Sequence, residues 1–237
     1  MKNTIVFLLF ICHFSYSQTV EFITKNDTLQ KPKYQQFICI NDATDTAGLI
    51  KVARIKVSGS IENPILLFLT INAEAQKLGA NSFKFNDFKK NEDNSAELIL
   101  DVYFSTDEIL ETNFKNIPKN KIYIFGDDNL LKTKSQNYKI DGVKYEIGSG
   151  QFKEFSVKVG EELKINKGGF TGMTIWIKGI EDKSSTFINF SGANVTGGSY
   201  NPYNRGVGIS INTGFINKME PNIALFLLKI FKEQKYK

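Results

Sequence analysis

Histidine, the side chain that most often acts as a general base, occurs once in the 237-residue chain, as His13. This residue lies in an N-terminal segment with the pattern of an export signal, so we expect the exported protein to contain no histidine. A Ser-His-Asp triad, a Cys-His pair and a His-ligated zinc site are therefore disfavoured.

Carboxylates are the residues that could still catalyse hydrolysis without histidine. Paired acids cleave glycosidic bonds when their carboxyl groups lie about 5–9 Å apart in a cleft. The C-terminal half offers five candidates, each of which also fits an exposed strand edge or a turn: Glu146, Glu154, Glu161, Glu162 and Asp182. A His-independent carboxylate hydrolase acting on envelope glycans is therefore the alternative function, and a non-enzymatic role is the leading one.

Cysteine and metal chemistry are similarly restricted. Cys12 belongs to the N-terminal segment, and the apolar run Phe37–Ile40 favours Cys39 as a small buried hydrophobe over a reactive thiol. The oxygen-rich groups Asp127–Asn129 and Asn41–Asp45 are better explained as turns than as cation sites. The sequence also contains no P-loop, dinucleotide fingerprint or nucleophile elbow, and we predict neither a cofactor nor a metal.

One segment could bind a ligand. Residues 191–206, SGANVTGGSYNPYNRG, are expected to form a surface loop, on which Tyr200, Tyr203 and Arg205 could present aromatic and cationic contacts. The only tryptophan, Trp176, lies in the apolar run 174–177 and is expected in the core or on a sheet face. Carbohydrate enzymes favour aromatic platforms in their clefts, so a single tryptophan in such a setting gives the glycan-hydrolase alternative little support.

Residues 1–17 have the layout of a secretory signal peptide. Lys2 is followed by the apolar stretch Ile5–Cys12, and the small residues Ser15 and Ser17 precede the expected cut before Gln18. The stretch is too short for a spanning helix, which needs about 20 residues. We expect an exported protein that is periplasmic, outer-membrane-associated or secreted, without a transmembrane span.

Export would remove Lys2, so the formal charge would fall from +5 to +4. The remaining lysines are dispersed along the chain. Nucleic-acid binding would require a concentrated basic stripe with interleaved aromatic residues, and we expect no nucleic-acid partner.

An α/β module is expected over residues 18–118. Asn63-Pro64 predicts the start of a helix over 65–78, which Gly79 would end and which its apolar sequence should largely bury. Alternating strands are predicted near 51–59, 82–88 and 97–104, and 105–108 fits a capping box that opens a short helix.

The stretch Ala75-Gln76-Lys77-Leu78-Gly79-Ala80-Asn81-Ser82-Phe83 is similar to the A-x-x-L-G-A-N module of small bacterial α/β proteins. Some of these are described as heavy-metal-binding proteins and others as small periplasmic stress proteins. The resemblance covers about residues 51–88. It implies a small envelope module, whereas the metal function would need ligands that this half lacks.

A β-rich domain is expected over residues 119–237. Asp141-Gly142 lies between two alternating runs and predicts a hairpin with a type I′ turn. Further strands are predicted at 121–125, 151–159, 162–166, 173–178, 186–190 and 207–212, which suggests an antiparallel β-sandwich or a barrel-like domain. Pro221 favours a helix over a strand for 223–231.

The predicted class is therefore α+β, and the predicted function is that of an exported envelope protein, most simply a non-enzymatic binding or assembly module. Its partner would be an unknown protein or envelope component, and a homo-oligomeric state stays open. Membrane association through the glycine-rich loop and the terminal apolar segment is a third option. Asp27-Thr28 and Asp45-Thr46 also match an acidic–Thr–aliphatic glycosylation pattern.

Overall fold

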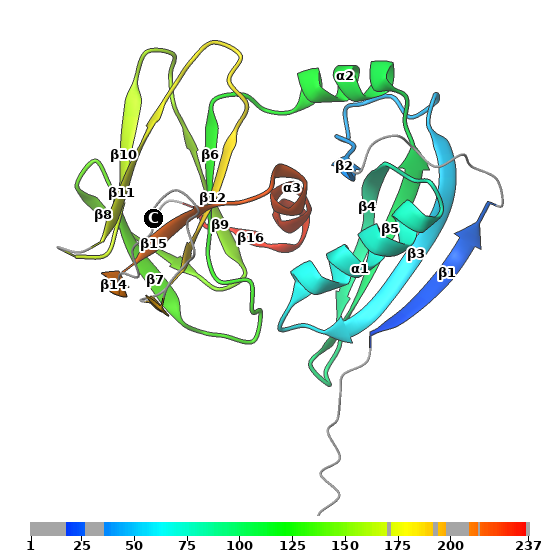
Figure 1. Ribbon diagram of the computed structural model, residues 1–237, viewed down its shortest axis with the longest axis horizontal. Helices are drawn as coiled ribbons and strands as arrows, with labels where there is room; N and C mark the ends of the chain where they lie inside the picture. The colour runs from blue at the N-terminus through cyan, green and yellow to red at the C-terminus, as the bar shows by residue number, and fades with distance from the viewer. Residues whose placement is uncertain are drawn as a thin grey trace, which may run out of the picture.

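The computed structural model describes residues 18–26, 36–169, 172–191, 194–197, 209–212 and 214–235 (Figure 1). These residues form many strands and three helices, in agreement with the predicted α+β class. The expected export signal, residues 1–17, and the Asp27-Thr28 pair lie outside the described residues.

The N-terminal half forms a five-stranded sheet, called here the N-terminal sheet. Its spatial order is β1 (Thr19–Lys25), β3 (Ile50–Ser60), β5 (Ser95–Phe104), β4 (Ser82–Lys90) and β2 (Ile38–Cys39). The pairs are antiparallel except β2 with β4, which is parallel. The alternating residues Ile55, Val57 and Leu100 are fully buried on the face that α1 covers.

Helix α1 (Pro64–Lys77) begins and ends where the sequence predicts. The Asn63 side chain accepts a hydrogen bond from the Leu66 amide at 3.0 Å, and Gly79 has φ 87°, the left-handed conformation of a helix end. The prediction that α1 is largely buried is wrong for one face. Leu66 and Leu69 are 47% and 42% exposed.

Helix α2 (Asp107–Asn116) is present, but the predicted capping box does not form. Thr106 occupies the cap position without a side-chain cap hydrogen bond. The Ser105 hydroxyl instead bonds the Ser82 hydroxyl at 2.5 Å. Buried Asn113 connects α2 to β2, because its Nδ2 donates to the Cys39 carbonyl at 2.9 Å.

The C-terminal half contains two larger sheets. The four-stranded sheet has the order β11 (Met173–Lys178), β10 (Glu162–Lys167), β7 (Ser135–Ile140) and β8 (Val143–Gly148). The mixed sheet has the order β15 (Phe215–Lys218), β12 (Thr186–Ser191), β6 (Lys121–Phe125), β9 (Gln151–Ser156) and β16 (Lys232–Glu233). A second apolar cluster, which includes Ile124, Ile140 and Ile165, fills the space between these sheets.

The purely antiparallel prediction is wrong for the mixed sheet. Strands β12 and β6 are parallel, as are β16 and β9. The sheets also do not close into a barrel, so the barrel-like alternative fails. Asp141 and Gly142 have φ 49° and 85°, which confirms the predicted turn between β7 and β8.

The region predicted as one long loop contains regular structure. Strand β13 (Asn194–Gly197) pairs with β14 (Ile209–Asn212) in a separate two-stranded sheet. A strand near 207–212 was predicted, whereas β13 lies inside the stretch assigned to the loop.

Helix α3 (Pro221–Ile230) confirms the predicted C-terminal helix and lies between the two halves of the molecule (Figure 1). One apolar cluster contains Phe68 and Phe83 from the N-terminal half together with Tyr123, Phe187 and Phe226 from the C-terminal half. The expected domain boundary at residue 118 stays a prediction. Residues on both sides of it belong to this one apolar cluster.

Candidate functional site

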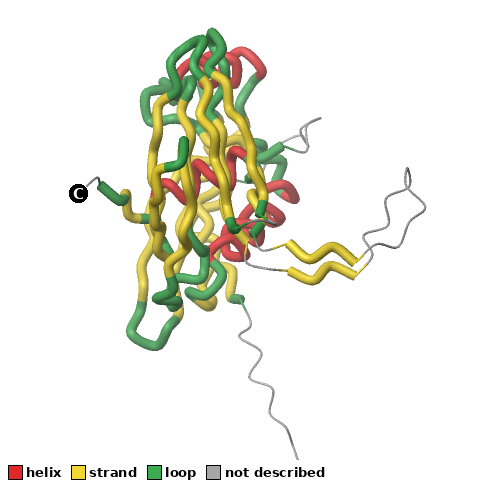
Figure 2. The backbone as a smooth tube through the Cα atoms, turned by 90° about the vertical axis from the view of Figure 1, so that its left-hand side faces the viewer, coloured by secondary structure: helices red, strands yellow, loops and turns green. Residues whose placement is uncertain are grey.

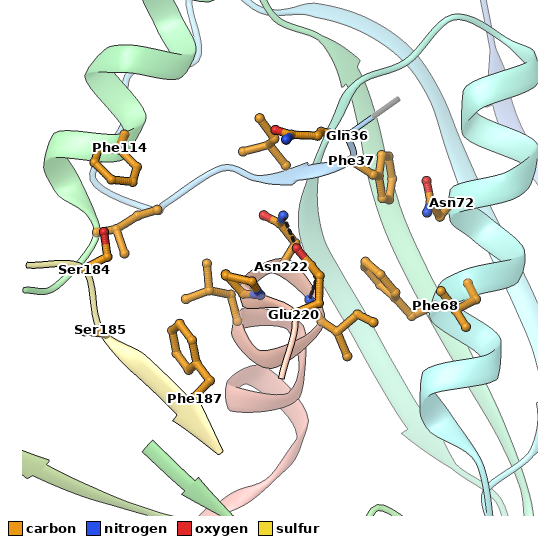
Figure 3. Close-up of a pocket in the computed structure, with 16 residues that line it drawn as sticks. Gln36, Phe37, Phe68, Asn72, Phe114, Ser184, Ser185, Phe187, Glu220 and Asn222 are labelled. Atoms are coloured by element: carbon orange, nitrogen blue, oxygen red, sulfur yellow. Dashed lines mark hydrogen bonds between the residues drawn. The ribbon is translucent and has the colours of Figure 1, made fainter. Parts of the chain in front are cut away.

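A cavity of about 600 Å³ lies at the junction of the two halves, and we call it the seam cavity (Figure 3). Its lining comes from the segment before β2, from α1, from the end of α2, from the start of β12 and from the start of α3. These elements are far apart in sequence, and the shared core brings them together.

Aromatic rings form much of the wall. Phe37 and Phe68 lie 5.8 Å apart between centroids, and both rings contact Phe83 behind them at 4.8 and 5.1 Å. On the other side, Phe187 stacks on Tyr123 at 5.3 Å. Because these rings are buried in the core, the apolar wall is held rigidly from both halves.

The N-terminus of α3 is fixed by three hydrogen bonds at the rim. Glu220 accepts from the Ile223 amide at 2.8 Å and from Asn222 Nδ2 at 2.7 Å (Figure 3). Asn222 Oδ1 in turn accepts from the Cys39 amide at 2.9 Å, which attaches α3 to β2. The Glu220 carboxylate is therefore engaged as a helix cap rather than held free for acid–base chemistry.

Polar groups are few, and one of them has no partner. Asn72 projects from α1 towards the cavity (Figure 3), and its buried Oδ1 has no hydrogen-bond partner among the described residues. The buried Ser185 hydroxyl donates to the Pro118 carbonyl at 2.7 Å. A buried acceptor without a donor is costly, so Asn72 marks the place where a ligand donor would be stabilising.

Two further cavities adjoin the seam cavity. One of about 610 Å³ shares Gln36, Ile38 and Phe114 with it and extends along α2. Another of about 190 Å³ shares Phe187 and Leu225 with it and extends towards Cys39. The space along the junction is therefore elongated.

Two ionisable groups that line the cavity of about 190 Å³, Cys39 and Tyr123, favour their neutral forms. Burial raises the pKa of the Cys39 thiol to about 12, and Cys39 is 5% exposed, as expected of a buried hydrophobe. Burial, with a further contribution from Glu154, also raises the pKa of Tyr123. Neither side chain is an activated nucleophile at neutral pH.

None of the sequence-proposed residues that the structure describes lines this site. Tyr200, Tyr203 and Arg205 lie outside the described residues. The five candidate carboxylates are exposed or half-buried, and none lines the cavities described above: Glu146, Glu154, Glu161, Glu162 and Asp182. Trp176 lies on a sheet face, 58% exposed, far from full burial.

The described part of the chain contains no group of three or more His, Cys, Asp or Glu side chains placed to hold a metal ion. Within the same residues, no helix is long and apolar enough to cross a membrane.

The lining residues carried no recognisable signal in the sequence. Phe37, Phe68 and Phe187 have the pattern of ordinary core residues, because a binding wall and a core wall use the same side chains. Asn72 was the one available hint, since it is polar and lies next to the apolar stretch 64–71 of α1.

Comparisons with known proteins give no assignment for this fold or site. No family model matches the chain, no curated protein matches its sequence, and no solved structure matches it.

Proposed function

We propose that the protein is an exported, non-enzymatic binding protein of the cell envelope and that its seam cavity takes a small apolar ligand. One observation carries the proposal: an apolar cavity of about 600 Å³ contains a buried, unpartnered acceptor, Asn72 Oδ1. Small-molecule sites have volumes of roughly 300–1,000 Å³ and combine apolar walls with few polar groups.

The ligand would be an elongated apolar molecule with one hydrogen-bond donor. Phe37, Phe68 and Phe187 would contact its apolar body, and Asn72 would accept from the donor. The adjoining cavities leave room for a longer molecule than the seam cavity alone could hold. Hydroxyl and carboxamide groups in the lining support binding rather than bond cleavage, because neither is basic at neutral pH.

The arrangement of the halves is part of the same proposal. Residues 18–118 would be a small α/β module of the envelope type that residues 51–88 resemble, and 119–237 would be a sandwich-like domain. Helix α3 would hold the two together, so the cavity would exist only when both halves are folded.

The direct test is titration with N-phenyl-1-naphthylamine, an apolar fluorescent probe with one N–H donor. We expect saturable binding of one probe per chain, and weaker binding when Leu69 at the cavity wall is enlarged to Trp. Absence of saturable binding would contradict the proposal. Equal affinity of the parent and of Leu69→Trp for the probe would contradict it as well.

A further inference from the structure

The outer face of the four-stranded sheet is a second surface of interest. Alternation along its strands buries Ile140, Ile165 and Ile177 in the sandwich and leaves the intervening side chains outside. Figure 2 looks onto this side of the molecule and shows the helices behind the strands. The outer face is therefore open to solvent over its described residues.

Trp176 is the large apolar side chain of this outer face. It is 58% exposed, although it is the only tryptophan of the chain and could have contributed a large apolar area to the core. Its cross-strand neighbour is Lys164, whose Nζ lies 5.9 Å from the ring centroid. More than half of the Trp176 surface is therefore available for contact with a partner, which favours a binding role.

A pair of groups beside Trp176 is already oriented for hydrogen bonding. Asn166 and Thr174 are directly opposite each other on β10 and β11, and Asn166 Nδ2 donates to Thr174 Oγ1 at 2.8 Å. This bond leaves the Asn166 carbonyl as an acceptor and the Thr174 hydroxyl as a donor. An aromatic ring beside such a pair suits a sugar, which presents apolar C–H faces and hydroxyl groups.

The far side of the same face carries two adjacent positive charges. Lys139 and Lys144 are directly opposite each other on β7 and β8, and both are exposed. Like charges in this position are destabilising, and neither lysine forms an ion pair with a described residue. An anionic partner would remove that repulsion.

The other charges on this face leave the lysines in excess. Lys164 and Lys178 add two positive charges, whereas Glu146 and Glu162 add two negative ones. The Asp141 carboxylate at the turn accepts a hydrogen bond from the Lys164 amide at 2.9 Å. With Asp141 included, these four lysines exceed the three carboxylates by one, so the net formal charge of this set of side chains is +1.

We propose that this face binds an acidic polysaccharide, with one sugar ring on Trp176 and its carboxylates or sulfates on Lys139 and Lys144. The row that runs from Thr174 through Asn166 and Lys139 to Lys144 crosses four strands. Its three strand spacings of about 4.8 Å give a span of roughly 14 Å, which requires an extended ligand. A single exposed aromatic residue makes the face a poor match for single-stranded nucleic acid, whose successive bases need several stacking rings.

The test is affinity electrophoresis of the purified protein through gels that contain alginate, an acidic polysaccharide, or neutral dextran. We expect retardation by alginate that decreases with salt, and no retardation by dextran. Trp176→Ala and the double variant Lys139→Gln/Lys144→Gln should each weaken alginate binding by about tenfold or more.

Two variants supply matched controls. Ile180→Ala removes another exposed apolar side chain, 53% exposed, and Lys89→Gln/Lys90→Gln removes the same charge from the exposed end of β4. Both should bind alginate as the parent protein does. Because Trp176 is the only tryptophan, its fluorescence should also change on alginate binding in the parent and in both controls.

Several results would overturn the proposal. Equal loss of binding in the two lysine pairs would show non-specific attraction, and equal retardation by dextran would show that the acid groups are irrelevant. Binding of poly(dT) or of phosphatidylglycerol vesicles through Trp176, without binding of alginate, would assign the face to another class of partner.

Discussion

Phe226 of α3 stacks on Phe68 of α1, with ring centroids 5.0 Å apart and an interplanar angle of 17°. The rings are 0% and 2% exposed and come from the two halves of the chain. An aromatic pair of this kind contributes about 0.5–1.5 kcal/mol beyond the burial of its area. The contact therefore joins α3 to α1, the helix that covers the N-terminal sheet, and supports the wall of the seam cavity.

Truncation of Phe226 to alanine should destabilise both halves together. Loss of a fully buried phenylalanine costs about 3–5 kcal/mol of unfolding free energy, and here the lost ring lies in the shared core. Urea unfolding followed by Trp176 fluorescence and by far-UV circular dichroism should give one coincident transition, shifted to lower urea. Leu66→Ala, at an exposed position of α1, should cost less than about 1 kcal/mol. Two separate transitions in the parent protein would contradict a shared core.

Replacement of Asn72 by leucine should affect stability and binding in opposite directions. The change removes a buried acceptor without a partner, so the ligand-free protein should gain about 1 kcal/mol in unfolding free energy. The same change removes the acceptor for the ligand donor, so affinity for N-phenyl-1-naphthylamine should fall several-fold. Thermal unfolding and probe titration measure the two effects. A variant that loses stability would show that Asn72 has a structural partner instead.

Asp101 is a buried carboxylate on the N-terminal sheet, only 7% exposed. Arg54 donates to both of its carboxylate oxygens at 2.8 Å, and Lys51 Nζ lies 2.6 Å from Oδ1. Burial would raise the pKa of Asp101, but the Arg54 hydrogen bonds and the Lys51 ion pair outweigh it and hold the pKa below its usual value.

A lowered folded-state pKa means that Asp101 stabilises the fold above its unfolded-state pKa of about 3.9. That contribution should disappear as the pH falls from about 4 through the lower folded-state value. Asp101→Asn should cost about 1–3 kcal/mol at pH 7, because Arg54 loses its charged acceptor. The unfolding free energies of variant and parent should converge in acid. A difference that persists undiminished at pH 2 would contradict this role.

The Cys39 thiol should be inert in the folded protein. Burial raises its pKa to about 12, whereas the unfolded thiol ionises near about 8.5. The unfolded state therefore loses its proton first, and the stabilisation due to the protonated thiol should decline as the pH rises from about 8.5 towards 12. Ellman's reagent should label Cys39 only on opening of the fold, and Cys39→Ala should show a smaller loss of stability between about pH 8.5 and 12 than the parent. Rapid stoichiometric labelling of the native protein at pH 8 would contradict this.

The sequence predicted helix ends and tight turns correctly where the backbone conformation admits only a few residue types. Asn63-Pro64 and Gly79 located both ends of α1, and Asp141-Gly142 located the hairpin, because few residues suit a helix cap or a positive φ. Pro221 likewise located α3. The exposure of Leu66 and Leu69 could not be predicted, since it depends on which neighbours α1 meets.

Contacts between residues far apart in the chain could not be predicted from the sequence. The parallel pairing of β12 with β6 depends on the path of the whole chain, whereas the alternation within each strand only indicates a half-buried strand. The seam cavity was missed for the same reason, because its phenylalanines have a core pattern and its polar group is one asparagine. The sequence directed attention to Tyr200, Tyr203 and Arg205, which lie outside the described residues.

The most direct measurement of the central claim compares two substitutions on α1. Leu69 lines the seam cavity and Leu66 does not, although their exposures are similar at 42% and 47%. Leu69→Trp and Leu66→Trp therefore add the same ring to the same helix, in the cavity wall or outside it. In titrations with N-phenyl-1-naphthylamine, we expect at least about tenfold weaker binding for Leu69→Trp, since the ring fills space that the ligand needs. Binding by Leu66→Trp should equal that of the parent. Equal affinities for all three proteins, or no saturable binding by the parent, would contradict a ligand site at the seam.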